Sequence, residues 1–178
     1  MIRVASPGRL APVNAVRHLA GLVRRTLVGI APGFARPDDA FALGWLEGRE
    51  AEAYGAMDPR DREHACRVAR RLLALHPDAE SQVVRAALLH DVGKAARPYR
   101  VWERVLVHVW TPDAATAGRL PRAWRGVWRA HREHAAQGAA RLRGLGVDAR
   151  VVDLVARHHQ PPGPDEALRQ LAGADEGT

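Results

Sequence analysis

An apolar run that ends in a His-Asp pair is the feature of this chain with the clearest chemical meaning. Residues 87–89 are Ala-Leu-Leu, and they are followed by His90, Asp91, Val92, Gly93 and Lys94. A neutral imidazole offers a nitrogen ligand of intermediate softness, and a carboxylate can bridge two cations through its two oxygens. The His-Asp pair therefore indicates a site for a divalent metal ion.

Further side chains of the metal-ligand type lie on or beside predicted helices, namely His64, His131, His134, His158, His159 and Asp175. His64 shares the apolar face of its helix with Val68 and Leu72, so we expect it to point inward. A single histidine on such a face is more often a packed core residue than a ligand. The His-Asp pair makes a ligand role more favourable, and the whole set predicts a metal site whose ligands come from separate parts of the chain.

Lys94 is the only lysine of the chain, because 26 of the 27 basic residues are arginine. An ammonium group is a compact charge with an adjustable pKa, whereas a guanidinium is planar and always charged. Chance survival in an arginine-rich composition is the simpler explanation of a lone lysine. Its place directly after the His-Asp pair favours a specific chemical role instead.

The composition limits the class of protein. A chain of 178 residues with 47% hydrophobic content is long enough for one substantial core. The formal net charge of +7 favours encounters with polyanions, but the arginines are spread along the chain and aromatic residues make up only 5%, so we do not expect a dedicated single-strand stacking platform. Cys66 is the only cysteine, which rules out an intrachain disulfide and leaves nitrogen and oxygen as the metal ligands.

No apolar run approaches the length of a membrane span, and residues 1–27 lack the apolar core of a signal peptide. We therefore expect a soluble, cytoplasmic protein that has no membrane partner.

Apolar spacings of three and four residues recur throughout, and β-branched alternation is nearly absent, which predicts an all-α fold. Asp58 and Pro59 are suited to begin a helix, and Gly93 is suited to end one. Residues 112–120 are expected to form a connector. The other predicted helices cover about residues 13–27, 37–54, 79–89, 99–109, 121–143, 151–159 and 164–174.

The order His64, His90-Asp91 with Gly93-Lys94, His134, His158-His159 and Asp175 resembles the HD superfamily of metal-dependent phosphohydrolases. The resemblance covers about residues 58–176. It implies an HD-domain helical bundle with extra N-terminal helices. Residues 1–57 would be a helical extension packed on the core, and residues 58–178 would be the HD domain.

The resemblance also implies roles for individual residues. A first metal ion would be held by His64, His90, Asp91 and Asp175. Asp91 would bridge to a second ion, held by His134 and by one of His158 or His159. Asp91 and Lys94 are the predicted catalytic residues, and Lys94 would hold the phosphate or stabilise charge in the transition state. The expected cofactors are one or two divalent ions from the set Fe, Mn, Mg, Ni and Zn, and His131 would support the site or pack in the core.

Several subfamily signatures are missing. The chain lacks the Glu-Asp pair of alarmone hydrolases, the Gly-Tyr-Pro of cyclic di-GMP phosphodiesterases after His159, and the His-Pro-Gly-His of deoxynucleotide triphosphohydrolases after Asp91. What remains is similar to compact binuclear members, including bacterial HD-type hydrolases of dinucleoside polyphosphates. The implied function is hydrolysis of a phosphate ester or anhydride by a metal-activated water, and the expected substrate is a nucleotide or a related small phosphorylated metabolite.

Two alternatives stay open. A few HD-fold proteins use a diiron pair for oxygen-dependent cleavage, and the metal ligands do not separate that chemistry from hydrolysis. The chain could also be a non-catalytic basic helical domain that binds nucleic acid or a partner protein. Nucleic acid is therefore a partner that we do not favour, and a homodimer is left open.

Overall fold

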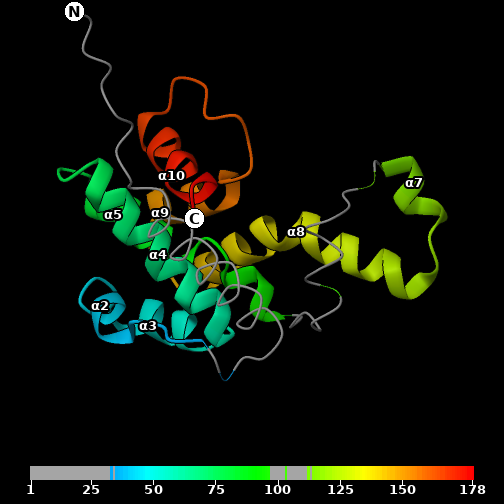
Figure 1. Cartoon of the computed structure of the whole chain (residues 1–178), viewed down its shortest axis with the longest axis horizontal. Coiled ribbons are helices and arrows are strands. Elements are labelled where there is room, and N and C mark those ends of the chain that lie inside the picture. Colours follow the sequence, from blue (N-terminus) through cyan, green and yellow to red (C-terminus); the bar gives the residue numbers. More distant parts are fainter. Residues whose placement is uncertain (1–32, 34, 97–102, 104–111, 113) are drawn as a thin grey trace, which may run out of the picture.

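The computed structural model describes residues 33, 35–96, 103, 112 and 114–178 (Figure 1). Within these residues the regular secondary structure is helical, and no β-strand is present. The all-α prediction is confirmed for this part of the chain. The predicted helices at about 13–27 and 99–109 lie outside it.

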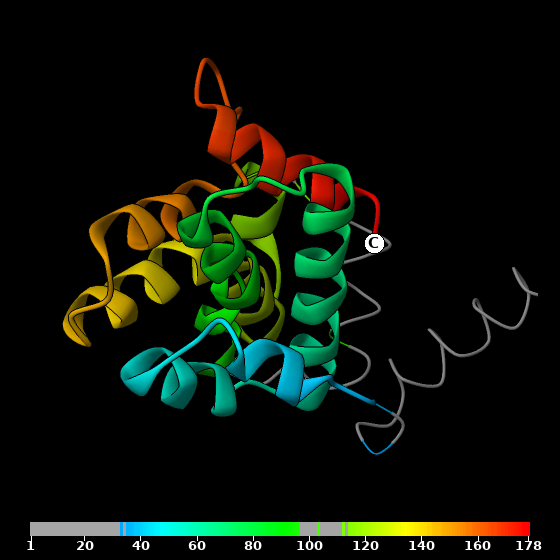
Figure 2. The same ribbon diagram turned by 90° about the vertical axis from the view of Figure 1, so that its left-hand side faces the viewer.

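The centre of the bundle is α5 (Ser81–Leu89), in which six of the nine residues are buried and apolar. It packs against α4 (Pro59–Leu75), α9 (Ala149–Arg157) and α10 (Glu166–Glu176), and α8 (Arg122–Gly144) packs against α9. Figure 2 shows α5 in green, with these helices around it. Fully buried leucines from all five helices fill the core, namely Leu72, Leu88, Leu142, Leu154, Leu168 and Leu171.

Two short helices precede this bundle and share its core. α2 (Asp39–Leu43) and α3 (Gly48–Gly55) replace the single helix predicted over 37–54. The chain leaves the helix after Gly44, and Gly48 has a φ of 50°, a left-handed conformation that glycine adopts readily. Ala42, Leu46 and Tyr54 are almost fully buried against the main core. The division of the chain at residue 57 stays a prediction.

Aspartate side chains fix the starts of the bundle helices. As predicted, Asp58 caps α4, with Pro59 as the first helical residue, and its carboxylate accepts a 2.9 Å bond from the Arg60 amide. Asp148 and Asp165 cap α9 and α10 in the same way. These caps set where each helix begins, and so which side chains reach the interior.

The N-terminal part of α8 projects from the bundle, and α7 (Ala114–Arg119) lies at its outer end (Figure 1). Residues 114–119 were expected to belong to a connector, and that expectation is wrong, because a short helix forms there. None of the described helices is both long enough and apolar enough to cross a bilayer.

Candidate metal centre

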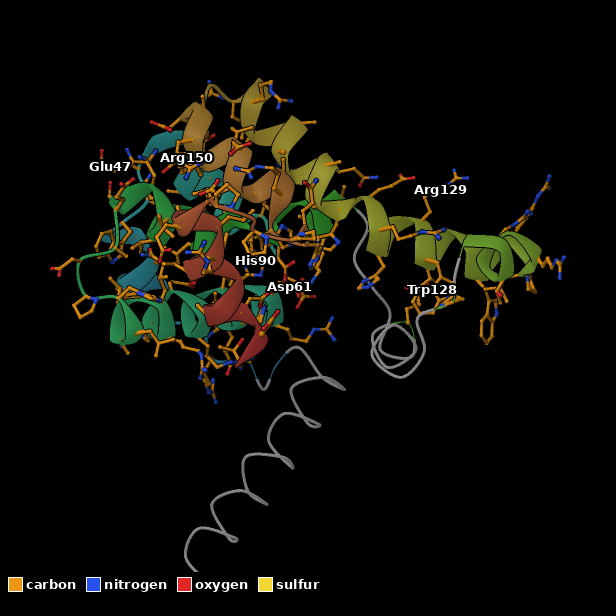
Figure 3. All side chains as sticks on the ribbon, turned by 90° about the horizontal axis from the view of Figure 1, so that it is seen from above. Glu47, Asp61, His90, Trp128, Arg129 and Arg150 are labelled. Carbon is orange, nitrogen blue, oxygen red and sulfur yellow. The ribbon has the colours of Figure 1, made fainter. Side chains whose placement is uncertain are left out.

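Three helices bring His64, His90 and Asp175 together. His64 comes from α4, His90 from the C-terminal end of α5, and Asp175 from α10. The Nε2 atoms of His64 and His90 lie 3.0 Å and 3.9 Å from Asp175 Oδ1. One candidate ligand atom of each residue lies within 4.8 Å of the others, and we call this group the first cluster. Figure 3 shows His90 inside the bundle, close to α10.

A second cluster combines His134 from α8 with His158 and His159 at the end of α9. Their candidate ligand atoms also lie within 4.8 Å of one another. The Nε2 atoms of His134 and His159 are 3.1 Å apart. His134 and His158 are buried, whereas His159 is more exposed.

Asp91 lies between the two clusters, and its side chain is only 2% exposed. One carboxylate oxygen, Oδ2, is 3.4 Å from His90 Nε2, and the other, Oδ1, is 3.3 Å from His134 Nε2. The two clusters are neighbours, because the ring centroids of His90 and His158 are 5.2 Å apart. A carboxylate in this position can serve both clusters at once.

The backbone orients three of the imidazoles in the same way. In each, Nδ1 faces the carbonyl oxygen of the residue three positions earlier: His90 to Ala87 at 2.9 Å, His134 to His131 at 2.6 Å, and His158 to Val155 at 2.8 Å. A carbonyl oxygen only accepts, so Nδ1 must carry the proton. Nε2 then presents its lone pair to the cluster, as a metal ligand requires.

His158 Nε2 gives a direct test of whether these residues suit a cation. The atom is buried and has no hydrogen-bond partner among the described residues, which is costly for a polar group. Burial, with the neighbouring His90, lowers the pKa of His158 to about 3, so the ring is neutral. Burial also lowers the pKa of His90 and of His159. Neutral imidazoles with free Nε2 atoms fit a divalent ion.

The two carboxylates are held in the ionised form. Burial raises the pKa of Asp91, but the Lys94 ammonium, 2.6 Å from Oδ2, and the neighbouring imidazoles outweigh it and hold the pKa well below its usual range. Burial likewise raises the pKa of Asp175, and the hydrogen bond from His64, together with the neighbouring His90, lowers it further than burial raises it. Anionic carboxylates beside neutral imidazoles form a donor set for divalent cations.

Gly93 allows Asp91 to approach His134. α5 ends at Leu89, before the glycine, so the prediction that Gly93 ends the helix is wrong. Gly93 instead lies in the 3₁₀ helix η2 (Val92–Ala96), which packs against α8. A Cβ atom on Gly93 would overlap the carbonyl oxygen of His134 and would lie 2.8 Å from the amide nitrogen of Gly138. Only a glycine allows the two backbones to lie this close.

All seven residues predicted as ligands lie in the two clusters or between them. The structure places both His158 and His159 at the second cluster, where the sequence had left a choice between them. His131 belongs to neither cluster, and its contribution is the carbonyl that orients His134. Sequence reasoning missed the orienting carbonyls, although the helical i−3 position of each histidine is a signal that would have found them.

A cleft of about 510 Å³ lies at the opposite end of α5. Its lining includes Glu47, Arg85 and Asp148, and it contains none of the cluster residues. Glu50, which also lines it, is already paired with Arg85 through a 2.9 Å bond from Nε. Among the described residues, the groups of three or more possible metal ligands are the two clusters, and neither lies at this cleft.

A family model described as HD domain matches residues 62–176, a segment that contains both clusters and Asp91. No curated protein and no solved structure gives a significant match to the chain.

Proposed function

This chain belongs to the HD-domain family, and we propose that it is a metal-dependent phosphohydrolase that acts on a nucleotide or a related small phosphorylated metabolite. The family is one of metal-dependent hydrolases. The observation that carries the proposal is the position of Asp91, whose two oxygens face two separate groups of three potential ligands.

In this proposal each cluster would hold one divalent ion. His64, His90 and Asp175 would hold the first, the three histidines of the second cluster would hold the other, and Asp91 could serve both. A pair of such ions lowers the pKa of water and neutralises negative charge on phosphate oxygens. The i−3 carbonyls keep Nε2 of His90, His134 and His158 directed at these sites, and the buried surroundings limit the access of bulk water.

Lys94 is placed to act on the phosphate itself. Its ammonium contacts the buried Asp91, but the Lys94 side chain is 22% exposed, whereas that of Asp91 is 2% exposed. The cation therefore lies at the boundary between the clusters and solvent, where an anionic group would enter. Charge-assisted hydrogen bonds from an ammonium to phosphate are strong, and they strengthen as negative charge develops.

The test is phosphate release from a panel of nucleoside mono-, di- and triphosphates and dinucleoside polyphosphates. The protein is reconstituted separately with Mn, Fe, Mg, Ni and Zn. We expect one substrate class to be hydrolysed, and Asp91→Asn to reduce the rate to background. Asp78→Asn, a change at an exposed loop residue, is the matched control and should leave the rate unchanged.

Equal hydrolysis by wild type and Asp91→Asn would overturn the proposal. So would iron-loaded protein that consumes oxygen with a substrate but releases no phosphate, because that result supports the diiron oxygenase alternative.

A further inference from the structure

Four arginines form a row along the projecting part of α8. Arg122, Arg125, Arg129 and Arg132 are three or four positions apart, so they fall on one side of the helix over about 15 Å. All four side chains are exposed. Figure 1 shows this part of α8 extending from the bundle, and we call these residues the arginine row.

The arginine row has less counter-charge than most of the described arginines of the bundle. Arg60 and Arg150 hold carboxylates at 2.8 Å and 2.7 Å. In the row, the only described ion pair is that of Arg129 with Glu133, at 3.9 Å. Residues 114–132 contain five arginines and no acidic residue. Residues 114–132, which we call the arm, therefore carry a concentrated positive charge that the described carboxylates leave largely uncompensated.

The apolar side of the arm is already covered. Val127 and Trp128 are 0% and 1% exposed, and they pack with Leu120. Figure 3 shows the side chains of Arg129 and Trp128 leaving α8 in different directions. A helix that binds a membrane surface needs its apolar side free for insertion. Trp124 is three and four positions before Val127 and Trp128 and so shares their side of the helix, but it is 38% exposed. The accessible features of this arm are therefore its charge and the exposed part of Trp124.

We propose that the arginine row binds the sugar-phosphate backbone of a single-stranded nucleic acid. Guanidinium groups recognise phosphates through paired hydrogen bonds, and a row of them along one helix side can follow several successive phosphates. The exposed part of Trp124 offers a surface on which an unpaired base stacks, which a base inside a duplex cannot do.

This surface is separate from the candidate metal centre. Arg132 and His134 are two residues apart on α8, so their side chains leave the helix on roughly opposite sides. A nucleic-acid strand bound to the arginine row would therefore not occupy the two clusters. The inference therefore stands whether or not the chain hydrolyses phosphate compounds.

The test is fluorescence anisotropy with a labelled oligouridine of about 12 nucleotides, a length within the site sizes of single-strand binders. Four phosphate contacts, each contributing a slope of about −0.7, predict that affinity falls about 50-fold between about 50 and 200 mM salt. An oligothymidine of equal length should bind similarly, because backbone and stacking are what the surface reads.

The decisive comparison is between two variants with equal loss of charge. R122Q/R125Q/R129Q/R132Q removes the arginine row, and glutamine keeps a good helix propensity. R49Q/R141Q/R143Q/R169Q removes four exposed arginines elsewhere. We expect the first variant to lose more than tenfold in affinity and most of the salt dependence, and the second to stay within about threefold of wild type. Trp124→Ala should weaken binding about tenfold.

Circular dichroism and melting curves establish that each variant is folded. Asp91→Ala should bind the oligonucleotide as wild type does, so a failure of the metal proposal does not affect this test. Equal losses in the two arginine variants would overturn the proposal, because they would show a net-charge effect. Tighter binding to duplex, or to phosphatidylglycerol vesicles, than to the single strand would also overturn it, as would no binding at low salt.

Discussion

The histidines of the metal centre are oriented by the helices that carry them. In His90, His134 and His158, Nδ1 is bonded to a carbonyl one turn earlier, and Nε2 is left for a ligand. The three rings thus have their tautomer and direction set by the backbone before a cation arrives. Such preorganisation reduces the ordering that metal binding would otherwise require.

Replacing Lys94 should separate catalysis from metal binding. In Lys94→Gln we expect the metal content of wild type, because the donor atoms of both clusters are untouched. Phosphate release should fall by about 10²–10³, the effect of removing one preorganised group that stabilises transition-state charge. Elemental analysis and initial rates on the same preparation measure both quantities. Unchanged activity, or metal loss that accounts for the lower rate, would contradict this role.

The two neighbouring histidines should differ in their contribution to the second site. His158 is buried and its ring is fixed by Val155, whereas His159 is more exposed. His158→Ala should therefore weaken binding of the second ion more than His159→Ala does, although both should weaken it. Titration of the metal-free proteins with Mn or Zn measures the difference. A variant of His158 that binds two ions as tightly as wild type would show this ranking to be wrong.

Ligand types at helix positions and helix ends singled out every residue of the clusters, together with His131, and the resemblance to the HD superfamily then set His131 aside. The sequence could not choose between His158 and His159. The two histidines are adjacent in the chain, so the sequence does not show which ring faces the site. That depends on how α9 packs against α8. The direction of each side chain, and how far it is buried, are set only when the helices pack together.

The contact between η2 and α8 sets the distance between Asp91 and His134. The backbone of Gly93 lies against those of His134 and Gly138 with no room for a side chain. Chain position made Gly93 look like a helix terminator, since glycine suits that role. A requirement for close approach between segments forty residues apart is invisible in the chain until both segments are placed.

Gly93→Ala should damage both the fold and the second metal site. The new Cβ would meet backbone atoms, which cannot turn aside, so we expect a loss of roughly 1–3 kcal/mol in unfolding free energy. Separation of η2 from α8 should also reduce occupancy of the second site. Denaturant unfolding and metal analysis measure the two effects.

Gly126→Ala is the matched control, because nothing lies within 4 Å of a Cβ there, in the interior of α8. That change should stabilise the protein slightly, by roughly 0.5–1 kcal/mol. If Gly93→Ala behaved like Gly126→Ala, the close contact would not be what positions Asp91.

Helix boundaries were predictable where capping chemistry is local. Asp58 with Pro59 marks the start of α4 as expected, and Pro121 precedes α8. The division between α2 and α3 was missed, because the apolar spacing continues across Gly44 and Gly48 while the backbone turns there. Apolar spacing indicates which side of a segment is buried. It does not reveal a turn after which the same side of the chain remains buried.

Charged residues join the last two helices of the bundle. Arg150 on α9 donates to Asp165 at 2.7 Å, and Arg157 donates to Asp165 at 2.5 Å and to Asp153 at 2.9 Å. The hydrogen bonds from Arg150 and Arg157 hold the pKa of Asp165 well below its usual range. This network anchors α10, which carries Asp175, to α9, which carries two histidines of the second cluster.

The network should make stability depend on acid in a predictable direction. A carboxyl whose pKa is lowered by folding stabilises the protein above its unfolded value of about 3.9, and that contribution is lost as pH falls. Asp165→Asn should melt below wild type at neutral pH, and the gap should shrink as pH decreases below about 4. Melting curves across this range measure the gap. Asp78→Asn, at an exposed site, should show little gap at any pH, and a constant gap for Asp165→Asn would contradict the linkage.

The candidate metal centre draws ligands from five helices that are distant in the chain. His64 is on α4, His90 ends α5, His134 is on α8, and the remaining ligands lie on or after α9 and α10. Cations at both clusters would therefore join every helix of the bundle.

Metal content per chain, measured by elemental analysis on protein purified without chelator or histidine tag, shows whether each cluster holds an ion. We predict about two divalent ions in wild type and about one each in His64→Ala and His134→Ala. His131→Ala, a change one turn from His134 that keeps the orienting carbonyl, should retain about two. Equal metal content in all four proteins, or no metal in wild type even after reconstitution, would contradict the binuclear centre.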